Sequence, residues 1–288
     1  MASMKEIKQR IENVSSTGNI IRAMDLVAST KLNRLRERLE GVRPIRSHLK
    51  RVITEIGREE KAQNNAYYAV RNVQNSLYIV ITADQGFSGA YNANVVSAAM
   101  EHMQGKHEKL LVVGAKGLEY FTQKQKNIIR KVVDLPDAQV YYGTESLARW
   151  VQSLYLSGEA DEVYIAYTRF RNVLSQEPCV ERLLPAPLSI GRLAGSSWRK
   201  YEPDLDTFIE NTIFLYLHMS LFAAFTEAHT SEHAARMVSM DAAQKNAEEM
   251  IEKLTHMYNR NRQAAITQEL SEIIGGSNII NKGEPDDS

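Results

Sequence analysis

Cysteine, proline and long apolar runs are scarce in this chain of 288 residues. The single cysteine, Cys179, excludes an internal disulfide framework and fits a reducing compartment. The densest apolar stretch, residues 209–225, is interrupted by polar side chains and is short for a transmembrane span. The N-terminus has no apolar signal region. These absences favour a soluble protein of the cytoplasm, which could still lie against a membrane complex.

An excess of charge of one sign is also missing, since 35 basic residues balance 35 acidic ones. Such a chain has no global attraction to nucleic acid or to an anionic membrane, so charged partners must be sought in local patches. One patch, residues 31–51, carries eight Lys or Arg side chains. Because it lacks aromatic residues and contains Glu37 and Glu40, we interpret it as a solvated or protein-contacting helix face rather than a nucleic-acid site.

Glycine and proline are absent from Asp204 to Ile274, a stretch of 71 residues. A single helix over this range would be about 105 Å long, roughly twice the width of a domain of this size. Apolar side chains in its second half recur at steps of three and four residues, which predicts a coiled-coil seam. The predicted seam is Met240, Ala243, Ala247, Met250, Leu254 and Met257, continued by Asn261 and Ala264.

The first sixty residues repeat this periodicity. The predicted seam is Ile7, Ile11, Val14, Ile21, Ala28, Leu32, Leu35, Leu39 and Val42, with Gly18 and Asp25 on the two remaining positions. Gly41 and Pro44 predict a kink or break, after which the helix resumes before Gly57. The N-terminal segment is basic and the C-terminal segment acidic, so we predict that the two helices pair as an antiparallel coiled coil.

The middle of the chain has a different pattern. Short apolar runs at residues 76–82, 109–115, 127–134 and 162–168 alternate with helix-like stretches. This alternation predicts βαβ units and a mostly parallel sheet. The expected fold class is therefore α/β, with a Rossmann-like domain inserted between two long terminal helices. The expected domains are an N-terminal helix at 1–57, the α/β domain at 75–200, a C-terminal helix at 204–280 and a flexible acidic tail at 281–288.

Candidate chemistry is sparse. The sequence VVGAKGLEY, residues 112–120, follows a strand and opens a helix, but it lacks a phosphate-loop spacing, so we expect a strand-to-helix turn. His229 and His233 have a zinc-compatible spacing without a third ligand. Ser231 beside His233 forms no triad, because adjacent helical residues do not face each other. Cys179 has no evident partner. We therefore predict no catalytic, cofactor or metal site.

The polar end of the long C-terminal helix, Asn259 to Leu270, stands out instead. A paired helix would show a clean apolar seam here, whereas this segment mixes arginine, glutamine, threonine and glutamate. Two interpretations stay open on composition alone. The segment is either a solvated, fraying tip or a helix end whose long polar side chains contact other proteins.

Four segments of the chain resemble those of one known family. Residues 231–276 closely resemble the C-terminal signature of the γ subunit of rotary F-type ATP synthases. The sequence IIRAMDLVASTKL (20–32) is similar to its N-terminal helix motif, ITADQGFSGAYNAN (81–94) to its first strand and turn, and YEPD (201–204) to the link into its C-terminal helix. The resemblance covers essentially the whole chain in order.

The resemblance implies a rotor function. In this family the terminal helices form a shaft inside a hexameric ring of nucleotide-binding α and β subunits, and the α/β domain lies near the membrane rotor. Because an asymmetric shaft contacts each ring subunit differently, its orientation biases each catalytic site toward a different conformation. The implied partners are the α, β and ε subunits and the c-subunit membrane ring, with one γ copy per complex and no cofactor or nucleic acid. The implied location is the cytoplasmic side of a bacterial cell membrane, as a peripheral protein, with catalysis in other chains.

The resemblance also implies contact residues. Met24 would lie close to the β subunits, and Tyr201 and Glu202 would lie at the foot near the membrane ring. The residues expected to contact the ring lining through polar groups are Arg262, Gln263, Thr267, Gln268 and Glu269.

Two regions depart from the family pattern. The turn that contains Gln85, Phe87 and Ser88 differs in sequence, and the segment after Gly276 is longer and more acidic. The alternative function is a cytoplasmic coiled-coil scaffold with an α/β head. An enzyme of the dinucleotide-binding kind is a third hypothesis.

Overall fold

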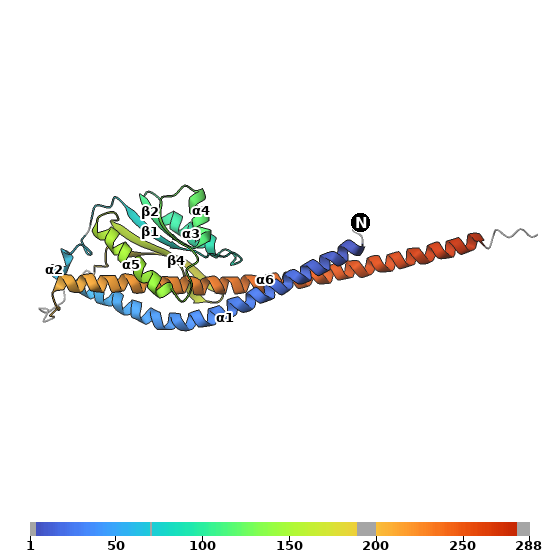
Figure 1. Ribbon diagram of the computed structural model, residues 1–288, viewed down its shortest axis with the longest axis horizontal. Coiled ribbons are helices and arrows are strands. Elements are labelled where there is room, and N and C mark those ends of the chain that lie inside the picture. Colours follow the sequence, from blue (N-terminus) through green and yellow to red (C-terminus); the bar gives the residue numbers. More distant parts are fainter. Residues whose placement is uncertain (1–3, 70, 189–199, 281–288) are drawn as a thin grey trace, which may run out of the picture. The chain divides into compact units, whose positions relative to one another are not determined.

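The computed structural model describes the backbone of residues 4–69, 71–188 and 200–280, and the side chains as far as Ile274. In chain order the elements are α1 (Met4–Ile56), α2 (Glu60–Gln63), β1 (Ser76–Ile81), α3 (Tyr91–His102), β2 (Glu108–Val113), α4 (Ala115–Gln123), β3 (Ile128–Val132), α5 (Val140–Leu156), β4 (Glu162–Asn172), β5 (Ser175–Leu184) and α6 (Leu205–Ile280) (Figure 1).

The chain forms two compact units. The α/β unit is Val27–Ser239, and the two-helix unit comprises the residues up to Leu26 and those from Met240 onward. Each terminal helix therefore contributes to both units. The predicted domain bounds at 1–57, 75–200 and 204–280 stay predictions, and the predicted acidic tail, 281–288, lies outside the described residues.

The sheet of the α/β unit has the strand order β3-β2-β1-β4-β5. The first four strands are parallel, as the sequence predicts, and Ile79 of β1 lies between Leu111 and Ile165 of its neighbours. Sequence reasoning missed β5, which runs antiparallel to β4 at the sheet edge. Its polar composition and Pro178 suit an edge strand, since an edge tolerates a residue that cannot donate a ladder hydrogen bond.

The two faces of this sheet are covered by different helices. Leu77, Ile79 and Ile81 point into a core formed with α5 and the α/β-unit parts of α1 and α6. Tyr78 and Val80 point the other way, into a second core with α3 and α4. Every residue of β1 is buried, which explains why this strand reads as a continuous apolar run.

Helix α1 continues through Pro44, so a break there is wrong, while the alternative of a kink stays a prediction. Proline removes one backbone donor and frees the carbonyl four residues earlier. The residues around it, Glu40, Gly41 and Pro44, all lie on the exposed face, where water can hydrate the freed carbonyl. The helix ends at Ile56, before Gly57, in agreement with the sequence-based expectation.

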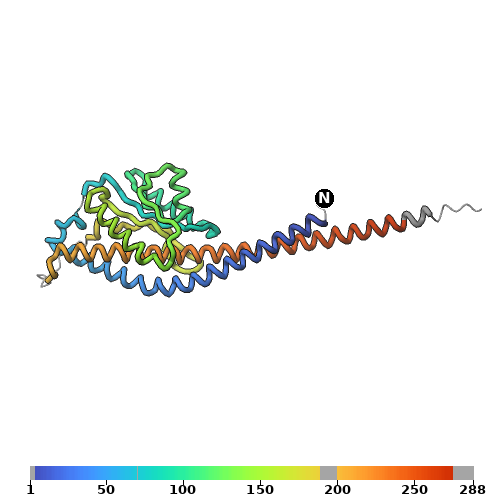
Figure 2. Tube along the Cα trace, viewed as in Figure 1, coloured from blue at the N-terminus to red at the C-terminus, as the bar shows by residue number. Residues whose placement is uncertain are grey.

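The predicted seam of α1 is confirmed. Its residues from Ile7 to Val42 are buried or half-buried, including Gly18 and Asp25, while the positions between them are mostly exposed. In the two-helix unit, α1 runs antiparallel to α6 and the two lie side by side (Figure 2). Burial of Ile7 to 1% exposure indicates that α6 covers α1 almost to its first turn.

Helix α6 spans 76 residues, which corresponds to about 114 Å. Its seam differs from the prediction at three positions, because Met250 and Met257 are 51% and 49% exposed and Ala264 is exposed as well. Ile251, Tyr258 and Ala265 take their places, so the steps after Ala247 run four-three rather than three-four. The predicted and the observed seam residues lie on nearly the same face of the helix, and contact with α1 decides which of two adjacent side chains is buried.

By length and composition alone, α6 contains a stretch apolar enough to cross a membrane. Of that stretch, 67% is buried inside the structure. Ile209, Ile213, Leu217 and Leu221 are completely buried in the core of the α/β unit. This burial accounts for the apolar character of the segment.

Candidate partner-contact site

The predicted tip residues lie on α6 in the two-helix unit. All five, Arg262, Gln263, Thr267, Gln268 and Glu269, are exposed. Thr267 donates a hydrogen bond to the carbonyl of Gln263 at 2.9 Å, and Gln268 donates to Glu272 at 3.0 Å. Within the described part of the chain, Arg262 and Glu269 form no ion pair. These two charges are therefore available to groups outside this chain.

Apolar side chains lie among these polar residues. Ile266, Leu270, Ile273 and Ile274 are between 48% and 67% exposed. Their spacing of four, three and one residues puts them on one face of a single helix. Sequence reasoning described this end of the helix as polar and missed the apolar face, although the same spacing rule could have found it. Clustered exposed apolar residues mark surfaces that bind other proteins.

Met24 lies on α1 beside the seam. Its side chain is half-buried, as is the neighbouring Asp25. One carboxylate oxygen of Asp25 is buried without a hydrogen-bond partner in the described ranges. Nearby, Ile20 and Leu26 are 61% and 69% exposed. Met24 is thus partly seam residue and partly accessible surface, next to apolar side chains that α6 does not cover.

Tyr201 and Glu202 lie in the α/β unit, before the first turn of α6. The hydroxyl of Tyr201 lies 3.4 Å from Glu59, and its ring centroid lies 5.2 Å from that of Phe208. Tyr201 is therefore half-buried against its own chain, whereas Glu202 is exposed. Asp204 caps α6, because its carboxylate accepts from the amide and the hydroxyl of Thr207 at 2.9 and 2.8 Å. Of the two predicted foot residues, Glu202 is the more accessible.

The expected strand-to-helix turn after β2 is confirmed. Gly114 has φ 91°, and a β-carbon there would lie 2.2 Å from the carbonyl oxygen of Thr82. The first three amides of α4 are already occupied, by the side chain of Asp84, the carbonyl of Ala83 and the hydroxyl of Thr82. A phosphate would have no free helix amide to bind in this turn.

The other candidate chemistry is explained by contacts within the α/β unit. His229 lies 3.5 Å from Asp137, and Ser231 donates to the carbonyl of Thr168 at 3.0 Å. Arg236 donates to His233 at 3.2 Å, and burial together with Arg236 lowers the pKa of His233 to about 3. Burial raises the pKa of Cys179 to about 11. Across the described residues, no three potential ligands converge as a metal site.

The divergent turn after β1 is held by α6. Arg236 donates to the carbonyl of Gly86 at 3.2 Å and pairs with Glu232 at 2.6 Å. Phe87, by contrast, is 70% exposed and has φ 61°. Its side chain is thus presented on the surface of the α/β unit by a turn whose backbone is fixed.

The chain has clear relatives. The family model described as ATP synthase matches residues 3–280. The ATP synthase gamma chain of Moorella thermoacetica is 36% identical over 282 residues, which cover 97% of this chain and 100% of that protein. The gamma chain of Geotalea daltonii is 38% identical over 287 residues, with 97% and 99% covered.

Solved structures have the same fold. A chain in the mitochondrial ATP synthase of Euglena gracilis, in a structure of OSCP, F1 and the c-ring, matches with a TM-score of 0.69 and 19% identity, covering 99% of this chain and 98% of that one. A central-stalk chain of the Tetrahymena thermophila mitochondrial ATP synthase matches with a TM-score of 0.60 and 22% identity. Because the sequence match spans almost the entire chain and the relatives are more than a third identical over their full length, this chain belongs to the family of ATP synthase gamma chains.

Proposed function

We propose that this chain is the central rotor shaft of an F-type ATP synthase. In this role it couples ion flow through a membrane ring to conformational changes at the ATP sites of a surrounding hexamer of α and β subunits. The observation that supports the role most strongly is the exposed tip of α6, where Arg262 and Glu269, which form no ion pair among the described residues, are presented together with exposed apolar side chains. A coiled-coil scaffold would not account for the family membership.

The tip would contact the lining of the hexamer. Arg262 and Glu269 would form ion pairs with ring side chains, because a charge that is buried on assembly needs a partner. Gln263, Thr267 and Gln268 would supply adaptable hydrogen bonds, and Met24 would lie close to the β subunits. The exposed apolar side chains of Ile266 and Leu270 would be buried against the hexamer lining. This hydrophobic contribution is non-directional, so it does not require an exact alignment of the two surfaces.

The foot would contact the membrane rotor. Glu202 would reach the c-subunit ring, while Tyr201, already packed on Phe208, would hold the segment in place. An ε subunit would bind the same assembly, with one copy of this chain in each complex. The protein would lie on the cytoplasmic side of a bacterial cell membrane, as a peripheral subunit.

The chain itself would be non-catalytic. The helix amides after β2 are occupied, and His229, His233 and Ser231 are engaged in contacts with their own chain. The shaft would instead change the energies of ATP sites in other subunits, since contacts that differ between two states shift the equilibrium between them.

The proposal is tested by the paired substitution Arg262→Ala with Gln263→Ala. Both side chains are exposed, so we expect the folding free energy of the chain to change by less than about 0.5 kcal/mol. ATP hydrolysis by the assembled complex, or the yield of that complex, should fall several-fold. The control is Gln123→Ala with Lys124→Ala, which likewise removes one amide and one positive charge, from an exposed end of α4. Equal losses in the two variants would contradict the assignment of the tip.

A further inference from the structure

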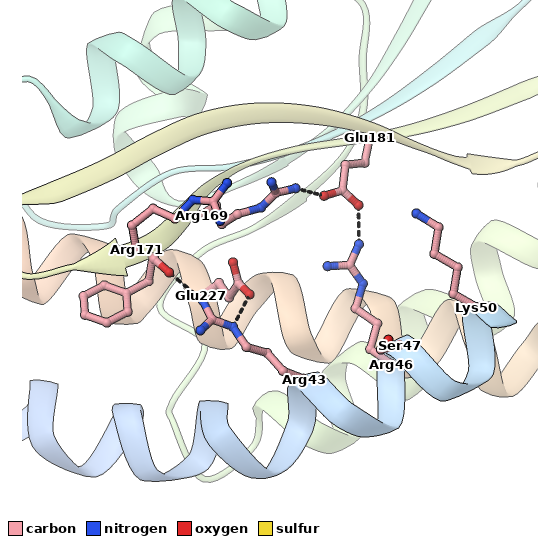
Figure 3. Close-up of a pocket in the computed structure, with 9 residues that line it drawn as sticks. Arg43, Arg46, Ser47, Lys50, Arg169, Arg171, Glu181 and Glu227 are labelled. Carbon is pink, nitrogen blue, oxygen red and sulfur yellow. Dashed lines mark hydrogen bonds and ion pairs between the residues drawn. The ribbon is translucent and has the colours of Figure 1, made fainter.

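A basic pocket in the α/β unit has no part in the proposed shaft contacts. It has a volume of about 530 Å³ and lies between α1, β4, β5 and α6 (Figure 3). Its lining residues are Arg43, Arg46, Ser47, Lys50, Arg169, Phe170, Arg171, Glu181 and Glu227. Three of the cationic side chains, Arg43, Arg46 and Lys50, come from the basic stretch 31–51, so part of that stretch lines this pocket.

At the back of the pocket, one carboxylate forms ion pairs with two guanidinium groups. Glu181 of β5 forms ion pairs with both Arg46 of α1 and Arg169 of β4. The side chain of Arg46 is only 14% exposed, and its Nε atom is buried without a hydrogen-bond partner in the described ranges. Burial opposes protonation of Arg46, but Tyr167 and Glu181 outweigh it, so the pKa of Arg46 lies above its usual value. Both guanidinium groups therefore stay charged.

A second carboxylate lies on α6. Arg43 donates to Glu227 at 2.8 Å and to the carbonyl of Phe170 at 2.5 Å. The other oxygen of Glu227 points away from Arg43 and has no hydrogen-bond partner in the described part of the chain (Figure 3). Polar atoms left unpaired on both sides of the pocket indicate that the chain's own side chains do not complete this cluster.

Two further cations lie at the mouth of the pocket. Arg171 pairs with Glu177 at 2.9 Å, but both side chains are 52% exposed, so this pair is weak and screened by salt. The amine of Lys50, which extends from α1 toward the strands, makes no ion pair among the described residues (Figure 3). Even when Glu177 is counted, five cations face three carboxylates, which leaves an excess of two positive charges in one pocket.

We propose that this pocket binds a small phosphate-class oxyanion, either free or as the headgroup of a phosphate ester. An oxyanion with two negative charges would balance the excess charge and accept hydrogen bonds from Lys50, Arg171 and the adjoining guanidinium groups. A phosphate group that keeps one proton could also donate to an acceptor such as Glu227. The concave shape and the buried Arg46 favour a compact anion over a flat protein surface. The site does not depend on the rotor role.

The test uses the purified full chain and titration calorimetry with inorganic phosphate and pyrophosphate. We expect a dissociation constant on the order of 1 mM or tighter, with pyrophosphate binding more tightly than phosphate and with binding that weakens as salt rises. A separate arm measures sedimentation with vesicles that contain phosphatidic acid, which distinguishes a lipid headgroup from free phosphate.

The critical variant is Lys50→Ala with Arg171→Ala, which leaves the buried ion pairs intact. It should weaken binding at least about tenfold. The control, Lys116→Ala with Arg149→Ala, removes the same charge from exposed ion pairs elsewhere on the α/β unit and should leave affinity unchanged within about twofold. Circular dichroism and the melting temperature in phosphate-free buffer establish that all variants are folded.

The outcomes are decisive. The site is supported if the wild-type chain binds the soluble anions or the vesicles, and if Lys50→Ala with Arg171→Ala weakens that binding while Lys116→Ala with Arg149→Ala does not. Saturable binding that both double variants weaken equally would reflect general surface charge and would overturn it. The absence of binding by the folded wild-type chain to either the soluble anions or the vesicles, at up to about 20 mM phosphate, would also overturn it.

Discussion

Two substitutions at Leu254 distinguish the effect of an interrupted α6 helix from the effect of lost side-chain packing. One replaces leucine by proline and the other replaces it by alanine. Leu254 is a seam residue of the two-helix unit and is half-buried. Leu254→Ala keeps the helix intact and removes part of its contact with α1. Leu254→Pro also removes the backbone donor to the carbonyl of Met250 and forces its ring against the preceding turn. Only the proline variant interrupts the helix.

The two free-energy costs follow from this position. Full burial of a leucine makes its replacement by alanine cost about 2 to 5 kcal/mol, and a half-buried site should cost about 1 to 2 kcal/mol. Proline inside a helix costs about 3 kcal/mol or more. Pro44 is tolerated in α1 because its turn faces solvent, whereas Leu254 faces the partner helix, where a bend separates the two seams. The proline variant should therefore lose both stability and mechanical continuity.

The assay is ATP hydrolysis and ion uptake measured on the same vesicles containing assembled complex. We expect Leu254→Ala to keep most of the ion transport per ATP while lowering the melting temperature. Leu254→Pro should either prevent assembly or hydrolyse ATP with little ion uptake. If the assembled proline variant pumped as many ions per ATP as the wild type, the reasoning that this stretch transmits torque would be refuted.

Two further predictions concern the α/β unit. Gly114→Ala should lower the unfolding free energy by more than about 2 kcal/mol in denaturant titrations, because its β-carbon would overlap the Thr82 carbonyl. Gly105→Ala, where φ is positive but the space around the residue is open, should lower it by about 1 kcal/mol. Similar losses in the two variants would refute the steric argument. His233 is held neutral by burial and by Arg236, so its folded pKa of about 3 lies below the unfolded value and the unfolded state binds more protons between about pH 6.5 and pH 3. The unfolding free energy should therefore fall as the pH decreases through this window, by up to roughly 4 kcal/mol, and His233→Asn should flatten the dependence; an unchanged pH profile would contradict it.

Periodicity was sufficient to predict the elements with strong local patterns. Strands β1, β2 and β4 are largely buried apolar runs, and the α1 seam repeats over more than thirty residues, so these elements could be located without tertiary information. Two errors arose where tertiary contacts decide. The turn at Pro44 survives because it faces solvent, and the α6 seam uses Ile251 rather than Met250 because of where α1 lies against it.

The residues missed by sequence reasoning carry weaker local signals. Strand β5 contains Pro178, does not alternate polar and apolar residues, and is defined mainly by its pairing with β4. The basic pocket joins Arg43 and Arg46 to Arg169, more than a hundred positions away, so only the fold brings them together. The tip residues were predicted from family resemblance. Their exposure is consistent with partner contact, but the roles assigned to individual residues stay proposals.

Direct observation of rotation tests the central claim. Leu174, in the turn between β4 and β5, is 84% exposed, so Leu174→Cys provides an accessible thiol for a bead. The native Cys179 is half-buried and burial raises its pKa to about 11, so little thiolate is available there at neutral pH. With the α and β subunits fixed to a surface, ATP should turn the bead steadily in one direction. A bead that stays stationary while the same complexes hydrolyse ATP at the full rate would contradict the rotor role.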